Sequence, residues 1–207
     1  MFVGGCVRKA LNKEFIDDFD LATSIVPVEL KNKLKKINLK VIETGVSHGT
    51  LTVLIDNKSF EITTLREDVS TDGRHAKVVF TKDWNKDAER RDFTINAIYL
   101  DKIGNVFDPT NGIEDLKNGI VRFIGNPEKR IQEDYLRILR YFRFFVQYSS
   151  IPHDQDTIKI IKQNLNGLNK ISNERKLLEL KKILNLKNFT NVFTDDKIKE
   201  LFFNIFP

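Results

Sequence analysis

The chain has 207 residues, of which 41% are hydrophobic and 30% charged, so it is long enough for one large domain or two small ones. With 16 Phe, 4 Tyr and 1 Trp it is too rich in bulky side chains for a disordered chain. It has no apolar run of the roughly 18 residues that a membrane span needs, and residues 1–11 do not match a signal peptide. We therefore predict a cytoplasmic protein without membrane contact. A single cysteine and three scattered histidines exclude an internal disulfide and a multi-cysteine zinc site.

The positive charge lies in the second part of the chain. Residues 1–121 carry 18 Lys and Arg against 19 Asp and Glu, a net charge of −1, whereas residues 122–207 carry 16 against 10, a net charge of +6. Such an excess suits a polyanionic partner, and a lysine-rich solvated helical surface explains it equally well.

Residues 1–121 alternate between short helical and extended segments, which predicts an α+β domain with a mixed, mainly antiparallel sheet. One helix begins at Pro27 and is expected to bury Leu30, Leu34 and Ile37. The other elements expected in this part are a short strand at 1–3, a helix at 8–13, extended segments at 15–21, 93–100 and 106–107, and a hairpin of 50–56 with 60–66.

From residue 126 onward the pattern is helical. The longest predicted helix runs from about Glu128 to Gln147, with one apolar face. That face is formed by Ile131, Tyr135, Leu139, Phe142 and Val146. Further helices are expected at 156–165 and 173–184, the second with Ser172 or Asn173 as N-cap. Residues 189–206 form an apolar, Phe-rich end.

Two acids in the extended segment after the first helix indicate a metal site. Asp18 and Asp20 are two residues apart, so on a strand both carboxylates project to the same face. Paired carboxylates suit Mg²⁺ in phosphoryl transfer, and a polar strand end explains the same residues equally well. Glu61, on another predicted strand, is the candidate third acid.

Two groups of residues suit phosphate. Gly4 and Gly5 precede a helix that carries Arg8, an arrangement in which backbone N–H groups and a guanidinium can approach an anion. An ordinary turn is the more common meaning of such a glycine pair. Arg90 and Arg91 form the second group, because guanidinium forks match phosphate oxygens.

Two further polar clusters suit a nucleoside. Asp92 and Asn96 can bond ribose hydroxyls, although a charged turn before a strand has the same composition. Glu133 and Asp134 precede Arg137 by four and three residues, so on one helix their heads would meet. Such a cluster is usually a surface ion pair, and it can also present acceptors and donors to a base edge.

Seven segments, in this order, resemble the class II tRNA nucleotidyltransferases, which are the CCA-adding enzymes, and the related bacterial poly(A) polymerases. They are FVGGCVR at 2–8, DDFDLAT at 17–23, GVSHGTLTV at 45–53, FEITTLRED at 60–68, TDGRHAKVVFTKDWNKDAERRDFTINAIY at 71–99, DPTNGIEDLKNGIVRFIGNPEKRIQEDYLRILRYFRF at 108–144, and SNERKLLEL at 172–180.

The resemblance implies a polymerase-beta-like nucleotidyltransferase head over residues 1–121, a helical neck over 122–185 and the start of a helical body over 186–207. The implied activity adds CMP and AMP from CTP and ATP to the 3′ end of tRNA, with release of pyrophosphate. A poly(A) polymerase acting on RNA 3′ ends and an inactive fragment are the alternatives. The family's leading helix, remaining body and tail are not matched, and we allow for a separate chain that supplies the body and tail.

The resemblance also assigns roles to residues. Residues 67–89 correspond to a flexible loop that the family needs for the switch to ATP, and Lys9 stands where the family usually has an acid. The implied roles are two-metal Mg²⁺ binding for Asp18 and Asp20, with Glu61 as third catalytic acid; triphosphate binding for Gly4, Gly5, Arg8, Arg90 and Arg91; ribose binding for Asp92 and Asn96; base recognition for Glu133, Asp134 and Arg137; and RNA binding for Arg130 and Arg140.

Overall fold

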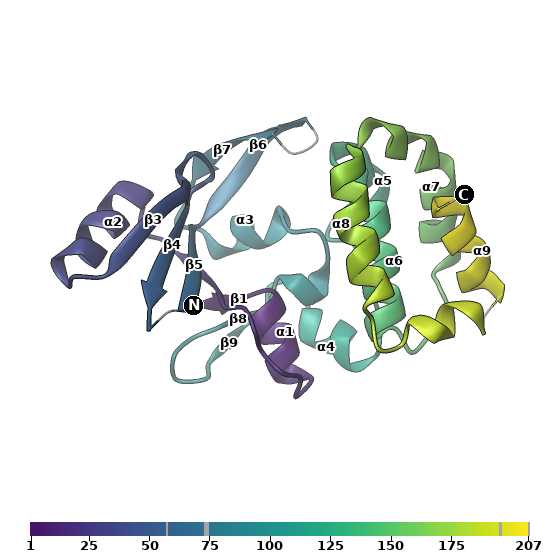
Figure 1. Cartoon of the computed structure of the whole chain (residues 1–207), viewed down its shortest axis with the longest axis horizontal. Coiled ribbons are helices and arrows are strands. Elements are labelled where there is room, and N and C mark those ends of the chain that lie inside the picture. The colour runs from purple at the N-terminus through teal and green to yellow at the C-terminus, as the bar shows by residue number, and fades with distance from the viewer. Residues whose placement is uncertain (57, 73–74, 195, 207) are drawn as a thin grey trace. The chain divides into compact units, whose positions relative to one another are not determined.

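The computed structural model describes residues 1–56, 58–72, 75–194 and 196–206. The chain forms two compact units (Figure 1). The first unit comprises Met1–Ser70 and Ala76–Ile113, and the second comprises Thr71–His75 and Glu114–Pro207. Among the described residues, no helix combines the length and the apolar character needed to cross a membrane.

The first unit is built on a seven-stranded sheet with the order β3-β4-β5-β2-β1-β8-β9. The pair β2 and β5 is parallel, and the other neighbouring strands are antiparallel, so the predicted mixed, mainly antiparallel sheet is confirmed. Its strands are β1 (Phe2–Val3), β2 (Asp20–Thr23), β3 (Lys40–Gly45), β4 (Thr50–Ile55), β5 (Lys58–Thr64), β8 (Tyr99–Leu100) and β9 (Val106–Phe107).

Short helices and a second, two-stranded sheet complete this part of the chain. The helices are α1 (Gly5–Leu11), α2 (Pro27–Lys36), α3 (Trp84–Glu89) and α4 (Gly112–Lys117), and the second sheet pairs β6 (Arg66–Asp72) with β7 (His75–Phe80). Residues 67–89, predicted as a flexible loop, therefore include two strands and a helix. The predicted hairpin is confirmed, with Thr52 opposite Glu61, while Asn57 of its turn lies outside the described residues.

Three local predictions for this part were wrong. The segment at 15–21 becomes a strand only at Asp20, where pairing with β5 begins, and Phe15 before it is 86% exposed. Thr94–Asn96 is a 3₁₀ turn rather than strand, because the backbone N–H groups of Asn96 and Ala97 donate to the carbonyl oxygens three residues earlier, at 2.9 and 3.0 Å. Ile37 is 65% exposed because α2 ends at Lys36.

From α5 onward the described residues are helical. The helices are α5 (Pro127–Glu133), α6 (Leu136–Tyr148), α7 (Gln155–Asn164), α8 (Asn173–Leu184) and α9 (Asp196–Ile205), with 3₁₀ segments at Leu165–Lys170 and Phe189–Phe193. The side chain of Ser172 caps the N-terminus of α8, which confirms the first of the two predicted N-caps, Ser172 and Asn173.

The single helix predicted over 128–147 is wrong, because the chain breaks between α5 and α6. Asp134 has φ −154° and ψ 104°, which is extended backbone. Its carboxylate accepts the backbone N–H of Leu136 at 3.1 Å and a hydrogen bond from Arg175 on α8 at 2.7 Å. Aspartate competes for local backbone groups in this way, so it favours caps and turns over helix interiors.

The core of the second unit forms around α6. Leu139 and Phe142, on the predicted apolar face, are fully buried. The Phe202 ring of α9 packs on Phe142 with ring centroids 5.6 Å apart, and Phe189 packs on Phe202 at 5.9 Å. The Phe-rich end therefore forms a helix that packs within its own unit.

Candidate active site

The acids predicted to bind metal gather at the parallel pair of strands. Asp20 begins β2 and is the register partner of Glu61 on β5. Burial raises the pKa of Asp20, and the negative charges of Asp18 and Glu61 raise it further, while the positive charge of Arg91 opposes them. The three acids therefore share one electrostatic environment. Asp18 lies two residues before the strand, rather than within it as predicted.

This cluster has the chemistry of a cation site. Asp20 is partly buried, whereas Asp18 and Glu61 are exposed. Like charges close together favour a divalent cation, and Mg²⁺ is commonly held by one or two carboxylates together with substrate phosphates. Within the described residues, no three His, Cys, Asp or Glu side chains are grouped closely enough to hold an ion by themselves. Asp18 and Asp20 fit the smaller carboxylate set, and Glu61 stays a predicted third acid.

The glycine turn lies beside the nucleotide-binding candidates of the same unit. Gly4 has φ +71°, in the left-handed region that favours glycine, and α1 begins at the next residue. A Cβ atom on Gly4 would lie 3.7 Å from Arg91 Nη1 and 3.7 Å from the Asn96 carbonyl oxygen. Arg8, which is buried, donates a hydrogen bond to Asn96 Oδ1, and Asn96 Nδ2 donates one to Asp92 Oδ1 at 2.9 Å. Sequence positions far apart thus converge here.

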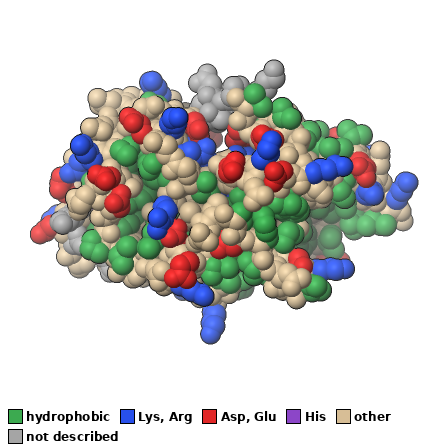
Figure 2. Space-filling model, turned by 180° about the vertical axis from the view of Figure 1, so that it is seen from behind, with side chains coloured by type: hydrophobic (Ala, Val, Ile, Leu, Met, Phe, Trp, Pro, Cys, Tyr) green, Lys and Arg blue, Asp and Glu red, His purple; other side chains and the backbone are tan. Residues whose placement is uncertain are grey.

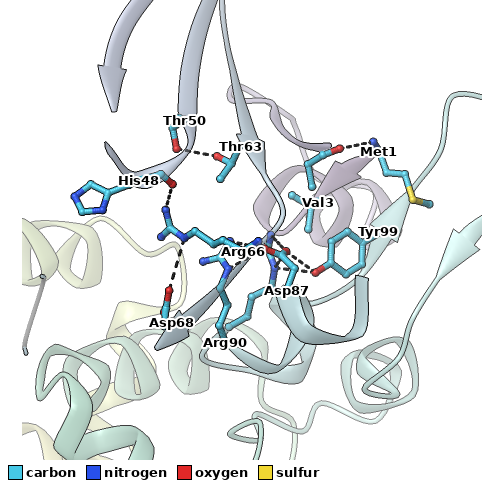
Figure 3. A network of polar contacts seen from close by, with 12 residues as sticks. Met1, Val3, His48, Thr50, Thr63, Arg66, Asp68, Asp87, Arg90 and Tyr99 are labelled. Carbon is cyan, nitrogen blue, oxygen red and sulfur yellow. Dashed lines mark hydrogen bonds and ion pairs between the residues drawn. The ribbon is translucent and has the colours of Figure 1, made fainter. Parts of the chain in front are cut away.

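Asp87 is a buried acid that the sequence analysis missed. In Figure 3 its carboxylate lies among Arg66, Arg90 and Tyr99. It accepts hydrogen bonds from Arg90 Nε at 2.8 Å, from Arg91 Nη2 at 2.9 Å and from the Tyr99 hydroxyl at 2.8 Å. Burial alone would raise the pKa of Asp87, but Arg91 and Arg90 outweigh it and hold that pKa below its ordinary value. The available signal was the helical spacing of three and four residues to Arg90 and Arg91.

Arg66 extends the same group toward the second sheet. Its backbone N–H donates to Asp87 Oδ1 at 3.3 Å, its guanidinium donates to the carbonyl oxygen of His48, and its Nε lies 3.7 Å from Asp68 Oδ1 (Figure 3). Burial, together with the nearby Arg90, lowers the pKa of Arg66 to about 10. The group around Asp87 therefore holds an excess of positive charge.

In the second unit, the two neighbouring acids predicted for base recognition, Glu133 and Asp134, bind different arginines. Glu133 accepts a hydrogen bond from Arg130 Nη1 at 2.6 Å and another from Arg137. Asp134 turns instead to Arg175 of α8 at 2.7 Å, because the helix is broken at this residue. The prediction that Glu133, Asp134 and Arg137 meet on one side of a single helix was therefore wrong. Arg175, a partner on a distant helix, was not foreseen.

The two basic residues predicted to bind RNA both contact neighbouring side chains. Arg130 belongs to the ion pair with Glu133, and the Arg140 guanidinium lies over the Phe144 ring, 5.4 Å from its centroid. On the face seen in Figure 2, Lys and Arg side chains of the described residues are interspersed with Asp and Glu.

Comparison with known proteins agrees with the fold described above. Residues 1–122 match the family model of the poly A polymerase head domain, and the chain belongs to this family.

Similar proteins have more specific names. The chain is 52% identical over 184 residues to "CCA tRNA nucleotidyltransferase 1, mitochondrial" of Homo sapiens, a match that covers 87% of the chain and 42% of the human protein. The structure of the Bacillus stearothermophilus CCA-adding enzyme in complex with CTP matches 91% of the chain with a TM-score of 0.79 and 38% identity, over 45% of its own length. A tRNA nucleotidyltransferase complexed with a primer tRNA and an incoming ATP analog matches 99% of the chain with a TM-score of 0.78 and 26% identity, over 58% of its own length. The chain thus spans less than half of the first two proteins.

Proposed function

We propose that this chain is the nucleotidyltransferase part of a CCA-adding enzyme. It adds CMP and AMP from CTP and ATP to the 3′ end of tRNA and releases pyrophosphate. The observation that carries this proposal is the pairing of Asp20 with Glu61 on the parallel strands, with Asp18 and Arg91 close enough for their charges to act on Asp20. The names of the relatives support the choice of tRNA, CTP and ATP.

The carboxylates of Asp18 and Asp20 hold Mg²⁺ in this proposal, with Glu61 as the third acid. Bound Mg²⁺ ions would polarise the α-phosphate and favour ionisation of the attacking 3′-hydroxyl. Because burial and the neighbouring acids raise the pKa of Asp20, a bound cation would favour the carboxylate form of this side chain.

The remaining residues of the first unit bind and orient the nucleotide. The bare backbone at Gly4 and Gly5 lets the triphosphate approach, and Arg8, Arg90 and Arg91 supply positive charge. Asp92 and Asn96, which are hydrogen-bonded to each other, face the ribose. These residues hold the α-phosphate in line for attack, and that orientation is most of what a protein contributes to phosphoryl transfer.

Base recognition is assigned to the break between α5 and α6. Arg137, held by Glu133, supplies donors to a base edge, and Asp134, held by Arg175, supplies an acceptor. Arg130 and Arg140 are assigned to the RNA backbone. In this proposal residues 1–121 form the head, 122–185 the neck and 186–207 the start of a body.

Incubation of the chain with Mg²⁺ and tRNA lacking its 3′ end tests the proposal, with CTP alone, ATP alone and both. We expect two CMP and one AMP to be added with both nucleotides, and Asp18→Ala or Asp20→Ala to reduce incorporation about 100-fold or more, because metal ions supply several kcal/mol of transition-state stabilisation. Long adenylate tails on generic RNA would favour the poly(A) polymerase alternative instead. Absence of any incorporation would identify an inactive fragment.

The location of the protein is a separate question. The cytoplasmic location stays a prediction, and the human relative carries a mitochondrial name. Fluorescence microscopy of the tagged full chain in its own cells distinguishes the two.

A further inference from the structure

One carboxylate in the first unit connects three elements and does not belong to the predicted metal group. The side chain of Asp87 on α3 is 1% exposed, so its charge is almost fully removed from water. A buried carboxylate is retained only where ion pairs and hydrogen bonds offset the cost of burial. Its partners therefore indicate what this residue does.

The side chains that contact Asp87 include two arginines predicted to bind triphosphate and one tyrosine of the sheet, and the Arg66 backbone N–H donates to it as well. Oδ1 of Asp87 accepts a hydrogen bond from Arg90 Nε at 2.8 Å and lies 2.8 Å from Arg90 Nη2, so two nitrogens of one guanidinium contact this oxygen. Oδ2 accepts from Arg91 Nη2 at 2.9 Å and from the Tyr99 hydroxyl at 2.8 Å. Arg91 Nε also donates to the Tyr99 oxygen at 3.1 Å, so Arg91 is held from two sides.

Tyr99 ties this group to the rigid part of the unit. It is fully buried in β8, where it pairs with Val3, the residue before Gly4. The Trp84 ring of α3 packs edge-on against the Tyr99 ring, with centroids 5.4 Å apart. The position of the Asp87 carboxylate is thus fixed by the sheet strand that neighbours the glycine turn.

The same geometry places the arginines where the proposed chemistry needs them. Arg91 lies 3.7 Å from the point where a Gly4 Cβ would stand, and its charge acts on Asp20. The side chains of Arg90 and Arg91 are 15% and 16% exposed, so neither is completely buried. One carboxylate facing two guanidinium groups leaves a net positive charge that an anion can share.

We infer that Asp87 is a positioning residue, which holds Arg90 and Arg91 in the orientation that binds the nucleotide triphosphate. This inference rests on the proposed function. An arginine side chain has several rotatable bonds, and ordering it costs conformational entropy. Asp87 meets that cost during folding, so the two arginines are already ordered when CTP or ATP arrives.

The test is CTP binding by calorimetry, without tRNA, combined with steady-state kinetics on tRNA. Asp87→Asn keeps the shape of the side chain and removes its charge. We expect the Kd and the KM for CTP and ATP to rise about tenfold, with the KM for tRNA unchanged. Tyr99→Phe, which removes only the hydroxyl, should raise the CTP Kd about threefold, and it serves as the milder variant if Asp87→Asn fails to fold.

Two comparisons separate positioning from a general loss of stability. Val53→Ala lowers the stability of the same unit from β4, where Val53 is 1% exposed in the core, and should leave the CTP Kd unchanged. If Asp87 acts through Arg90, the double variant of Asp87→Asn with Arg90→Lys should bind CTP about as weakly as Arg90→Lys alone.

The possible failures are distinct. If Asp87→Asn and Tyr99→Phe bind CTP as tightly as the unchanged chain, or if Val53→Ala weakens CTP binding as much as Asp87→Asn, the positioning role is refuted while the proposed function stands. If the unchanged chain itself binds neither CTP nor ATP and adds no nucleotide, the proposed function fails and this inference fails with it.

Discussion

Replacing Arg175 with methionine tests how much the break between α5 and α6 depends on a helix distant in sequence. Methionine keeps much of the aliphatic stem and removes the donor to Asp134, which lies 2.7 Å away. The two side chains are 23% and 20% exposed, so the pair lies between a surface pair, worth up to about 1 kcal/mol, and a buried pair, which costs about 3–5 kcal/mol to break. We expect Arg175→Met to reduce the free energy of unfolding by about 2 kcal/mol.

A matched control is available in the same helical unit. Lys162 and Glu200 are also 2.7 Å apart, but their side chains are 44% and 59% exposed. Lys162→Met should therefore reduce the free energy of unfolding by less than about 0.5 kcal/mol. The assay is urea unfolding followed by circular dichroism at a helical wavelength. Equal losses in the two variants, or a loss below about 0.5 kcal/mol for Arg175→Met, would refute the reasoning from burial.

Three further predictions concern Asp20, Gly112 and Phe202. Because the pKa of Asp20 is raised, the folded state binds the Asp20 proton more tightly than the unfolded state, and the stability that this proton contributes is lost as pH rises above about 4. In EDTA at pH 7, Asp20→Asn should therefore melt at a higher temperature than the unchanged chain. The same variant should not gain the stabilisation that Mg²⁺ gives to the unchanged chain. A Cβ on Gly112 would lie 2.2 Å from the Thr94 carbonyl oxygen, so Gly112→Ala should cost about 3 kcal/mol or more in urea unfolding, and a cost below about 1 kcal/mol would contradict the packing. Phe202→Ala removes the ring that packs on Phe142, so light scattering should detect self-association of this variant where the unchanged chain stays monomeric.

Local sequence patterns predicted the elements whose stability is local. The hairpin of β4 with β5, helix α2 and the Ser172 cap of α8 follow from alternation, periodicity and capping over a few residues. The 3₁₀ turn at Thr94–Asn96 and the break at Asp134 were missed. The break depends on how one carboxylate competes for a backbone N–H group. Helical periodicity does not register that competition.

The candidate site was predictable in composition more than in arrangement. Strand spacing and the resemblance to known enzymes both pointed to Asp20 and Glu61. Their opposition across β2 and β5 needs a parallel pairing, which no turn motif in the sequence predicts. The contact between Asp87 and Tyr99 was not predicted either, because the two residues lie twelve positions apart in different elements. Arg175 and Asp134 are paired across 41 positions of the chain.

The parallel pairing of β2 with β5 also bears on how the protein reaches its native state. Long-range strand pairs form slowly, because closing the intervening chain into a loop costs conformational entropy before the strand contacts can stabilise it. Here the closing contact brings Asp20 next to Glu61, so electrostatic repulsion is added to the entropic barrier at the same step. A divalent cation that screens these charges would therefore raise the refolding rate, in addition to its part in the proposed chemistry.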